Sequence, residues 1–357
     1  MKDGKLGVAI IGCGNIAGPY ADDLKANYAE VELLGVSDVD PARARQFGQD
    51  YEVRVYADNA ALLADPAVDI VVNLTSHFAH YSISTQALEA GKHVYSEKPL
   101  AVTTSEAFAL VELAKRKGLR LGCSPFTLMG EAQQTAWKAI RDGRLGTVRA
   151  VYAEVNWGRI ESWHPAPGPF YEVGALFDVG VYPLTILTAM FGPARRVQAY
   201  GKVLYPDRVT REGVPFHIST PDWVVTVLEM GDTVVRLTTG FYVPNNKAQT
   251  GIEFHGDLGS LHLRSWHSFD SQVDIATFDD SYQAMELIRP PASDVPWGRG
   301  VWDMAAAMLA NRPHRFTGDQ AAHIVEILNA AAQSMQTGQR IEVTSSFTPP
   351  APMDWAV

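Results

Sequence analysis

The first residues in the chain that could do chemistry form a glycine-rich turn. Gly12, Gly14 and Ala17 have Gly-x-Gly-x-x-Ala spacing and follow a short apolar segment. Gly12 permits a tight turn, Gly14 lets the backbone approach a pyrophosphate group, and Ala17 lets the next helix pack closely on a sheet. We expect that helix to begin near Asn15, where its free N–H groups would favour phosphate. The spacing predicts a dinucleotide-binding turn.

An acidic residue follows this turn at the distance expected for ribose recognition. Asp38 ends a second apolar segment, about twenty residues beyond the glycines, where a carboxylate accepts hydrogen bonds from an adenosine ribose. Its charge would repel the 2′-phosphate of NADP, and Arg43 and Arg45, a few residues on, would soften that repulsion. We therefore expect NAD as the cofactor, with NADP less favoured.

A lysine stands at the end of a later apolar segment. Glu97-Lys98-Pro99 follow an expected strand over 93–96, and catalytic groups in open α/β sheets gather at the carboxyl ends of strands. A lysine beside a nicotinamide ring would hydrogen-bond a reacting hydroxyl and favour the ionised form of a neighbouring base. The alternative interpretation is a surface Glu-Lys pair before a turn proline.

The elements that must position these residues alternate through the first third of the chain. Strands and helices at this spacing are typical of βαβ units and a parallel sheet. Thr103 and Glu106 form a capping box that marks the start of one helix. The expected strands cover 6–11, 31–37, 70–74, 93–96 and 119–123, and the expected helices cover 16–26, 41–49, 59–63, 81–90 and 105–116.

The pattern changes after residue 125. Strands there follow one another without helices between them, which favours an antiparallel or mixed sheet. The expected strands cover 148–155, 197–204, 224–229, 233–239, 251–255 and 261–263, and the expected helices cover 131–142, 175–191, 301–310 and 319–336. We predict a dinucleotide-binding domain over 1–124, a substrate-binding and oligomerisation domain over 125–345, and a loose proline-rich tail over 346–357.

The chain resembles one known family, the glucose–fructose oxidoreductase/inositol dehydrogenase/rhizopine-catabolism (Gfo/Idh/MocA) oxidoreductases. The resemblance lies in Gly12-Cys13-Gly14-Asn15-Ile16-Ala17, Ala90-Gly91-Lys92-His93-Val94 and Glu97-Lys98-Pro99-Leu100-Ala101. It implies an α/β protein with an N-terminal Rossmann sheet and a C-terminal α/β domain, whose large, mostly antiparallel open sheet often joins subunits of a homodimer or homotetramer. It also implies hydride transfer between a nicotinamide cofactor and a hydroxyl or carbonyl group of a sugar, polyol or related cyclic alcohol.

The resemblance further implies a catalytic set of Lys98, Asp178 and Tyr182. Residues 174–182 are similar to the family segment that carries an aspartate and a proton-transferring residue, and Tyr182 replaces the histidine of inositol-dehydrogenase-like members. This tyrosine places the chain nearer the glucose–fructose oxidoreductase, xylose dehydrogenase and dihydrodiol dehydrogenase branch. Asp178 and Tyr182 would share one face of a helix, although Pro183 leaves the start of that helix open.

A mechanism follows from these three side chains. A free tyrosine has a pKa near ~10, and the Lys98 ammonium would lower it. Tyr182 would then take the proton of a substrate hydroxyl, while Asp178 would hold another hydroxyl. We expect the substrate pocket between the two domains. The alternative for Tyr182 is a side chain that packs on the sheet.

Further binding residues are implied by the same resemblance. Asn15, Ile16, Thr75, His80 and Glu97 would join Gly12, Gly14, Asp38 and Lys98 in binding the cofactor, whereas Ser76 and His77 depart from the family pattern. We predict no metal site, because no carboxylate or thiolate spacing accompanies the histidines.

Aromatic residues precede the Asp178 segment in a proline-rich loop. Trp163 and His164 would line the substrate pocket, because aromatic faces suit the C–H faces of sugars. A structural loop held by its aromatic residues is the alternative. Trp297-Gly298-Arg299 would either close the pocket or belong to the start of a helix.

Composition limits the classes of partner. The chain has 357 residues and a net charge of −10 without a basic tract, which argues against nucleic acid. Its two cysteines, Cys13 and Cys123, cannot form a disulfide framework, and we expect them to be buried and reduced. We expect no signal peptide and no membrane span, and hence a cytoplasmic protein.

Two other functions stay open for this sequence. One is a redox-neutral glycosidase that retains its NAD, and the other is a non-catalytic sugar sensor on the same fold. Retention of Lys98, Asp178 and Tyr182 speaks against the sensor. The sequence does not choose among monosaccharide, inositol, anhydrosugar, sugar acid and trans-dihydrodiol substrates.

Overall fold

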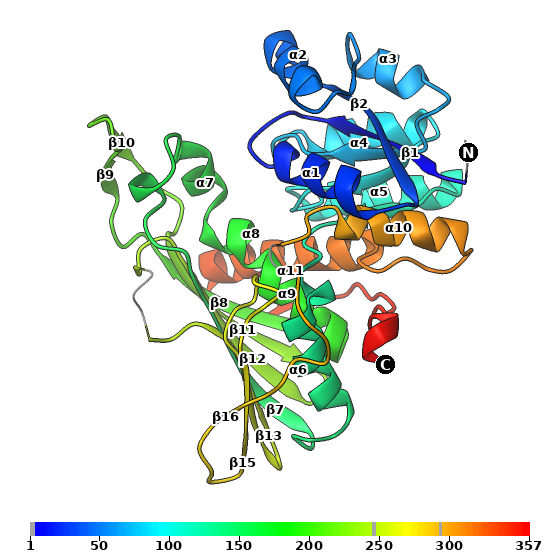
Figure 1. Ribbon diagram of the computed structural model, residues 1–357. Coiled ribbons are helices and arrows are strands. Elements are labelled where there is room, and N and C mark those ends of the chain that lie inside the picture. The colour runs from blue at the N-terminus through cyan, green and yellow to red at the C-terminus, as the bar shows by residue number, and fades with distance from the viewer. Residues whose placement is uncertain (1–3, 245–247, 293–294) are drawn as a thin grey trace. The chain divides into compact units, whose positions relative to one another are not determined.

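The computed structural model describes residues 4–244, 248–292 and 295–357, which form two compact units. The first unit combines Met1–Phe126 with Pro296–Val325, and the second combines Thr127–Val295 with Glu326–Val357. Each unit therefore contains segments that lie far apart in the sequence. Figure 1 shows the elements along the chain. Among the described residues, no helix is long and apolar enough to cross a membrane.

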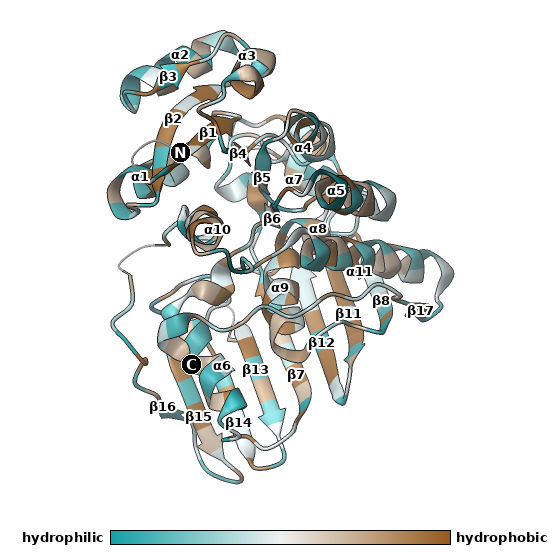
Figure 2. Ribbon diagram, turned by 90° about the vertical axis from the view of Figure 1, so that its right-hand side faces the viewer, coloured by the Kyte–Doolittle hydropathy of each residue, from teal (hydrophilic) through white to brown (hydrophobic). Residues whose placement is uncertain are grey.

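A six-stranded parallel sheet forms the centre of the first unit, with the strand order β3-β2-β1-β4-β5-β6. This is the dinucleotide-binding order, and it confirms the predicted Rossmann sheet. The strands are β1 (Leu6–Ile11), β2 (Val31–Ser37), β3 (Arg54–Val55), β4 (Ile70–Asn73), β5 (His93–Ser96) and β6 (Leu121–Cys123). Figure 2 shows that β1 and β2 are largely hydrophobic, as expected for strands covered on both faces.

The helices of the first unit begin close to where the sequence places them. They are α1 (Ala17–Asn27), α2 (Pro41–Asp50), α3 (Asn59–Ala64), α4 (His80–Glu89), α5 (Thr104–Lys117), α10 (Arg299–Leu309) and the start of α11 (Gly318–Thr337). The Thr103–Glu106 capping box is present at α5, and Gly118 ends that helix in the left-handed conformation.

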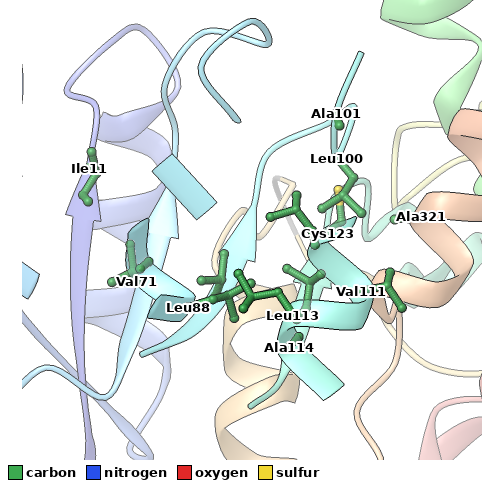
Figure 3. Close-up of a cluster of buried hydrophobic side chains, with 14 of the residues drawn as sticks. Ile11, Val71, Leu88, Leu100, Ala101, Val111, Leu113, Ala114, Cys123 and Ala321 are labelled. Carbon is green, nitrogen blue, oxygen red and sulfur yellow. The ribbon is translucent and has the colours of Figure 1, made fainter. Parts of the chain in front are cut away.

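The core of the first unit joins these helices to the sheet. Figure 3 shows side chains of β1, β4, α4, α5 and β6 gathered with Ala321 of α11. Cys123 belongs to this core, and Cys13 is also buried, with both thiols free. Burial of this apolar surface fixes the carboxyl ends of β4 and β5, after which Thr75, His80, Glu97 and Lys98 follow.

A nine-stranded, mostly antiparallel sheet forms the centre of the second unit, in the order β16-β15-β14-β13-β7-β12-β11-β8-β17. Within it only β7 and β12 pair in parallel. The strands are β7 (Val148–Asn156), β8 (Arg196–Lys202), β11 (Trp223–Met230), β12 (Thr233–Gly240), β13 (Gly251–Gly256), β14 (Gly259–Leu263), β15 (Val273–Thr277), β16 (Gln283–Ala284) and β17 (Ile341–Glu342). The predicted large antiparallel sheet is confirmed. Five described strands were not expected from the sequence: β15, β16 and β17 toward the edges of the sheet, and β9 (Asp207–Val209) and β10 (Pro215–His217), which form a separate hairpin.

One face of this sheet packs against helices. α6 (Glu131–Arg141) lies on β14 and β15, α8 (Ala175–Val179) lies on β11 and β12, and Ser334 of α11 accepts a hydrogen bond from the backbone of β8. The other face carries exposed apolar side chains. Cross-strand register places Tyr152, Tyr200, Val227 and Val234 on that same face.

The proline-rich C-terminal segment is not the loose tail that we expected. Met353 and Ala356 are buried, and the 3₁₀ turn Asp354–Ala356 packs on α6. The Met353 N–H donates to Gln134, and the guanidinium of Arg289 lies 3.7 Å from the ring of Trp355. Apolar burial and these polar contacts hold the segment, and a proline-rich composition alone does not reveal them.

Candidate active site

The glycine-rich turn leaves room for a pyrophosphate. Gly12 has φ +100°, and a Cβ there would lie 2.7 Å from the Leu74 carbonyl oxygen. A Cβ on Gly14 would meet nothing within 4 Å, so its backbone faces open space. The N-cap residue of α1, Ile16, makes no side-chain cap hydrogen bond, and the start of a helix favours an anion. These residues therefore fit a dinucleotide.

Asp38 lies directly after β2, beside the turn. Its Oδ2 accepts a hydrogen bond from the Cys13 N–H at 2.7 Å, and its Oδ1 accepts one from the Asp40 N–H at 2.8 Å. Each oxygen keeps a further lone pair for a ribose hydroxyl. Arg43 approaches Asp38 to 3.9 Å and is mostly exposed.

Burial, followed by the charge of Asp38, raises the pKa of the Cys13 thiol to about 12, so this thiol is no nucleophile at neutral pH.

Glu97 and Lys98 stand at the carboxyl end of β5, as predicted. The Glu97 Oε1 accepts a hydrogen bond from the Tyr20 hydroxyl at 2.7 Å, and its Oε2 accepts one from the Lys98 N–H at 3.1 Å. The Tyr20 hydroxyl also lies 2.8 Å from Ser124 Oγ, and burial raises the pKa of Tyr20 well above its ordinary value. A neutral Tyr20 thus holds the Glu97 carboxylate in place. Lys98 itself is half-buried.

Thr75 and His80 lie beyond β4. The Thr75 hydroxyl donates to the Asn73 side chain at 2.7 Å. His80 is buried, and its ring nitrogens lie 2.7 Å from the Pro99 carbonyl oxygen and 3.1 Å from that of Thr75. Burial lowers the pKa of His80. The side chain therefore joins the segment after β4 to the segment after β5, close to Lys98 in the sequence.

Asp178 and Tyr182 lie on two short consecutive helices, α8 and α9 (Val181–Phe191). Gly180 between them keeps right-handed helical angles, φ −65° and ψ −25°, so both residues stay on neighbouring turns. Pro183 falls in the first turn of α9 and lacks an N–H group, which explains why the helical ladder is interrupted there. Asp178 and Tyr182 are both half-buried.

An aromatic cluster surrounds Tyr182 within the second unit. Its ring centroid lies 4.8 Å from that of Trp266 and 6.0 Å from that of His267. Trp266 contacts Trp157 at 5.4 Å, and Trp157 contacts Trp163 at 6.5 Å. The structure therefore connects the predicted residues Trp163 and Tyr182 through two tryptophans that the sequence analysis did not single out.

The loop that carries Trp163 and His164 is itself ordered by ring contacts. Phe170 of α7 (Gly168–Val173) lies 5.9 Å from Trp163 and 4.8 Å from His164 between ring centroids. Trp163 remains 41% exposed, so its face is available to a ligand. The ring contacts of Phe170 and His164 with Trp163 fit the interpretation of a loop held by its aromatic residues, and a substrate-binding role for Trp163 and His164 stays a prediction.

A buried arginine holds the same loop, and no pattern along the chain pointed to it. Arg208 of β9 has no exposed side-chain surface, and it pairs with Glu161 at 2.7 Å and with Asp222 at 2.5 Å. Its guanidinium also donates to the Tyr171 hydroxyl at 2.6 Å and lies 4.3 Å from that ring. One charged network thus joins the loop, α7 and the β9–β10 hairpin.

Other predicted residues have structural roles. Gly298 precedes α10, and its N–H donates to Asp23 at 2.7 Å, while Trp297 packs 6.1 Å from Tyr20 between ring centroids. The 297–299 segment therefore begins a helix in the first unit. In the described part of the chain, no group of three or more histidine, cysteine, aspartate or glutamate residues could hold a metal ion.

Comparisons with known proteins agree with this fold. The family model described as "Oxidoreductase family, NAD-binding Rossmann fold" matches residues 6–124, and the GFO/IDH/MocA C-terminal domain matches residues 133–262. The chain is 30% identical over 313 residues to dTDP-3,4-didehydro-2,6-dideoxy-alpha-D-glucose 3-reductase of Saccharopolyspora spinosa, covering 84% of this chain and 90% of that protein. It is 27% identical over 303 residues to D-apiose dehydrogenase of Paraburkholderia graminis, covering 81% of this chain and 75% of that protein.

A solved structure supports the fold across nearly the whole chain. The NAD binding oxidoreductase from Klebsiella pneumoniae has a TM-score of 0.85 at 19% sequence identity, covering 96% of this chain and 100% of that chain. The chain belongs to the GFO/IDH/MocA oxidoreductase family. It is an NAD-binding oxidoreductase, which confirms the predicted family, enzyme class and cofactor.

Proposed function

We propose that this enzyme transfers a hydride between NAD and a CH–OH group of a sugar, polyol or related cyclic alcohol. The observation that carries the proposal is the set of Lys98, Asp178 and Tyr182 in a chain of an NAD-binding oxidoreductase family. The two relatives described above are a sugar reductase and a sugar dehydrogenase by name. The exposed face of Trp163 adds support, because aromatic rings stack on the C–H faces of sugars.

The cofactor would be held mainly by the first unit. Gly12, Gly14, Asn15 and Ile16 would bind the pyrophosphate at the start of α1, and Asp38 would accept hydrogen bonds from the adenosine ribose. Thr75, Glu97 and Lys98 would line the nicotinamide end, and His80 would position their two segments through its contacts with the Thr75 and Pro99 carbonyls. When bound, NAD accepts the hydride from the substrate carbon or returns it.

Proton transfer would fall to the residues of this chain. Tyr182 would take the proton of the reacting hydroxyl during oxidation and give it back to the carbonyl during reduction. The Lys98 ammonium would donate a hydrogen bond to the same oxygen and favour the ionised phenol. Asp178 would hold a neighbouring hydroxyl, since its own charge opposes ionisation of a tyrosine one helical turn away.

The experiment is a screen of aldoses, polyols and sugar acids that follows NADH absorbance, repeated with Lys98→Met and Tyr182→Phe. We expect each variant to lower kcat by about 100-fold to 10,000-fold, because each removes a proton-handling group, while NADH affinity changes little. Lys115→Met is the matched control, since Lys115 is an exposed lysine of α5 that should not affect turnover.

Three outcomes would contradict the proposal in different ways. Full turnover by Lys98→Met or Tyr182→Phe would contradict the role in proton transfer that is proposed for that residue. Bound NAD without net NADH formation, together with glycoside cleavage, would favour the redox-neutral glycosidase. Sugar binding without any turnover would favour a sensor.

We also propose that the exposed sheet face of the second unit joins two copies of this chain. Tyr152, Tyr200, Val227 and Val234 form an apolar stripe on that face, and Tyr200 is 62% exposed. Exposed apolar patches of this kind mark interaction surfaces.

We further propose a cytoplasmic location on the basis of two free, buried thiols, which cell fractionation would test.

A further inference from the structure

An exposed arginine, Arg159, follows β7 and contacts two tyrosine rings. The Arg159 Cζ lies 4.7 Å from the ring centroid of Tyr205 and 4.9 Å from that of Tyr242. The two ring centroids are 6.3 Å apart, so the three points form a nearly right-angled triangle. The two rings therefore contact the guanidinium from different directions, and Arg159 as a whole is exposed.

Ordered structure holds the backbone at or near both tyrosines. The Nε of Arg208 donates to the Tyr205 carbonyl oxygen at 2.9 Å, and Arg208 is itself buried between Glu161 and Asp222. Tyr242 follows β12, where Gly240 pairs with Asn156 of β7. The two ring contacts restrict the Arg159 side chain before any ligand arrives, which lowers the entropy cost of binding.

The charge of Arg159 is not used within the described part of the chain. The only contacts of its guanidinium there are the two aromatic rings, and no described carboxylate forms an ion pair with it. The whole chain carries a net charge of −10, so an anionic ligand would need a local positive group. A planar guanidinium with free N–H donors binds carboxylate or phosphate through paired hydrogen bonds.

The position of Arg159 relates it to the candidate substrate surface. Trp157, two residues earlier, is exposed and contacts Trp266 at 5.4 Å, and Trp266 contacts Tyr182 at 4.8 Å. Arg159 is two residues from Trp157, so their Cα atoms lie within about 7 Å of each other. Trp266 contacts the rings of both Tyr182 and Trp157, so a ligand that reaches from Tyr182 to Arg159 would extend along this aromatic cluster.

We propose that Arg159 binds a remote anionic group of the substrate. The substrate is then an elongated sugar that carries a phosphate or carboxylate beyond the reacting ring, such as a nucleoside diphosphate sugar or an acidic disaccharide. This inference rests on the proposed function, because Tyr182 defines the reacting end. It makes Arg159 a specificity residue for the charged end.

The test is calorimetric binding to the full chain saturated with NADH, with UDP-glucose, digalacturonate and maltose as probes. We expect one anionic probe to bind at least tenfold more tightly than maltose, and Arg159→Gln to weaken that probe at least tenfold without affecting maltose. High salt should weaken the same probe in the unmodified protein. The probe that responds identifies phosphate or carboxylate as the recognised group.

Two further variants separate recognition from folding. Arg211→Gln removes an exposed arginine from the turn of the same hairpin and should leave all three affinities unchanged. Arg159→Lys keeps the charge and should recover part of the lost affinity. Equal binding of all probes by the unmodified protein would overturn the proposal, as would unchanged anion binding by Arg159→Gln or an equal loss for maltose. Because these measurements need no turnover, they are independent of the Lys98→Met assay.

Discussion

Asp38 is the residue on which cofactor choice depends most directly. Its carboxylate is held by the Cys13 and Asp40 N–H groups, so its negative charge is fixed beside the glycine turn. We predict that Asp38→Asn raises the affinity for NADPH relative to NADH by about tenfold or more, because the repulsion of the 2′-phosphate is removed. Nicotinamide fluorescence titration measures both dissociation constants.

Asp40→Asn provides the control for this prediction. Asp40 is the N-cap of α2, and asparagine caps helices equally well, so the variant changes a nearby charge and keeps the fold. It should alter the NADPH to NADH ratio much less than Asp38→Asn. Tighter binding of NADPH than of NADH by the unmodified protein would contradict the assigned role of Asp38.

At the scale of elements, Arg208 holds the Trp163 loop, α7 and the β9–β10 hairpin together. We predict that Arg208→Met lowers the free energy of unfolding by about 3–5 kcal/mol, because Glu161 and Asp222 are left as buried, unpaired carboxylates. Urea denaturation measures the change. Arg211→Met, in the exposed turn of the same hairpin, should change it by less than about 0.5 kcal/mol. A small effect of Arg208→Met would mean that water or other groups satisfy the two carboxylates.

His314 connects the segment after α10 to β6 and makes the first unit sensitive to acid. Its Nε2 lies 3.1 Å from the Leu121 carbonyl oxygen, and burial lowers its pKa from 6.5 to about 4. Because the pKa of His314 is lower in the folded chain, the unfolded chain binds this proton at a higher pH than the folded chain does. The contribution of His314 to the free energy of unfolding is therefore complete above pH ~6.5 and is lost as the pH falls toward ~4. Burial also lowers the pKa of His80 and His93, which act in the same direction.

We predict that preferential protonation of His314 in the unfolded chain lowers the free energy of unfolding by about 2 kcal/mol as the pH falls from 7 to 5. His314→Gln keeps a donor for the Leu121 carbonyl and cannot be charged, so it should reduce the loss by about that amount. His217→Gln is the control, because His217 is exposed on β10. Urea unfolding at several pH values gives the slopes, and equal slopes for His314→Gln and the unmodified protein would refute the assignment.

At the scale of the whole molecule, the exposed sheet face predicts self-association. Val227 lies between Gln198 and Arg236 in the register of β8, β11 and β12, on the same face as Tyr200 and Val234. We predict that the unmodified protein is a dimer or tetramer and that Val227→Asp shifts it toward the 39.0 kDa monomer, because a charge would be buried without a partner. Light scattering after size exclusion measures the mass.

Val214→Asp gives the matched control for this substitution. Val214 is also exposed, but it lies in the turn before β10 and outside the sheet face. Its replacement should leave the mass unchanged. A monomeric unmodified protein, or a Val227→Asp variant of unchanged mass, would show that this face does not join subunits.

Local signals in the sequence determined most of the first unit. The glycine turn, the alternation of strands and helices, and the Thr103–Glu106 capping box depend on residues within a few turns of one another, so their pattern is readable along the chain. The short strand β3 was missed because two residues carry no periodicity. Lys98 at the end of β5 followed from the same local pattern and from the family resemblance.

Only the tertiary structure decided the contacts between residues far apart in the chain. Arg208 meets Glu161 and Asp222, Trp157 meets Trp266, and residues 296–325 return to the first unit, none of which leaves a local pattern. The C-terminal segment is buried for the same reason, since its partner α6 lies about 200 residues earlier. Such pairings depend on packing and charge burial in the folded chain, which composition and spacing do not encode.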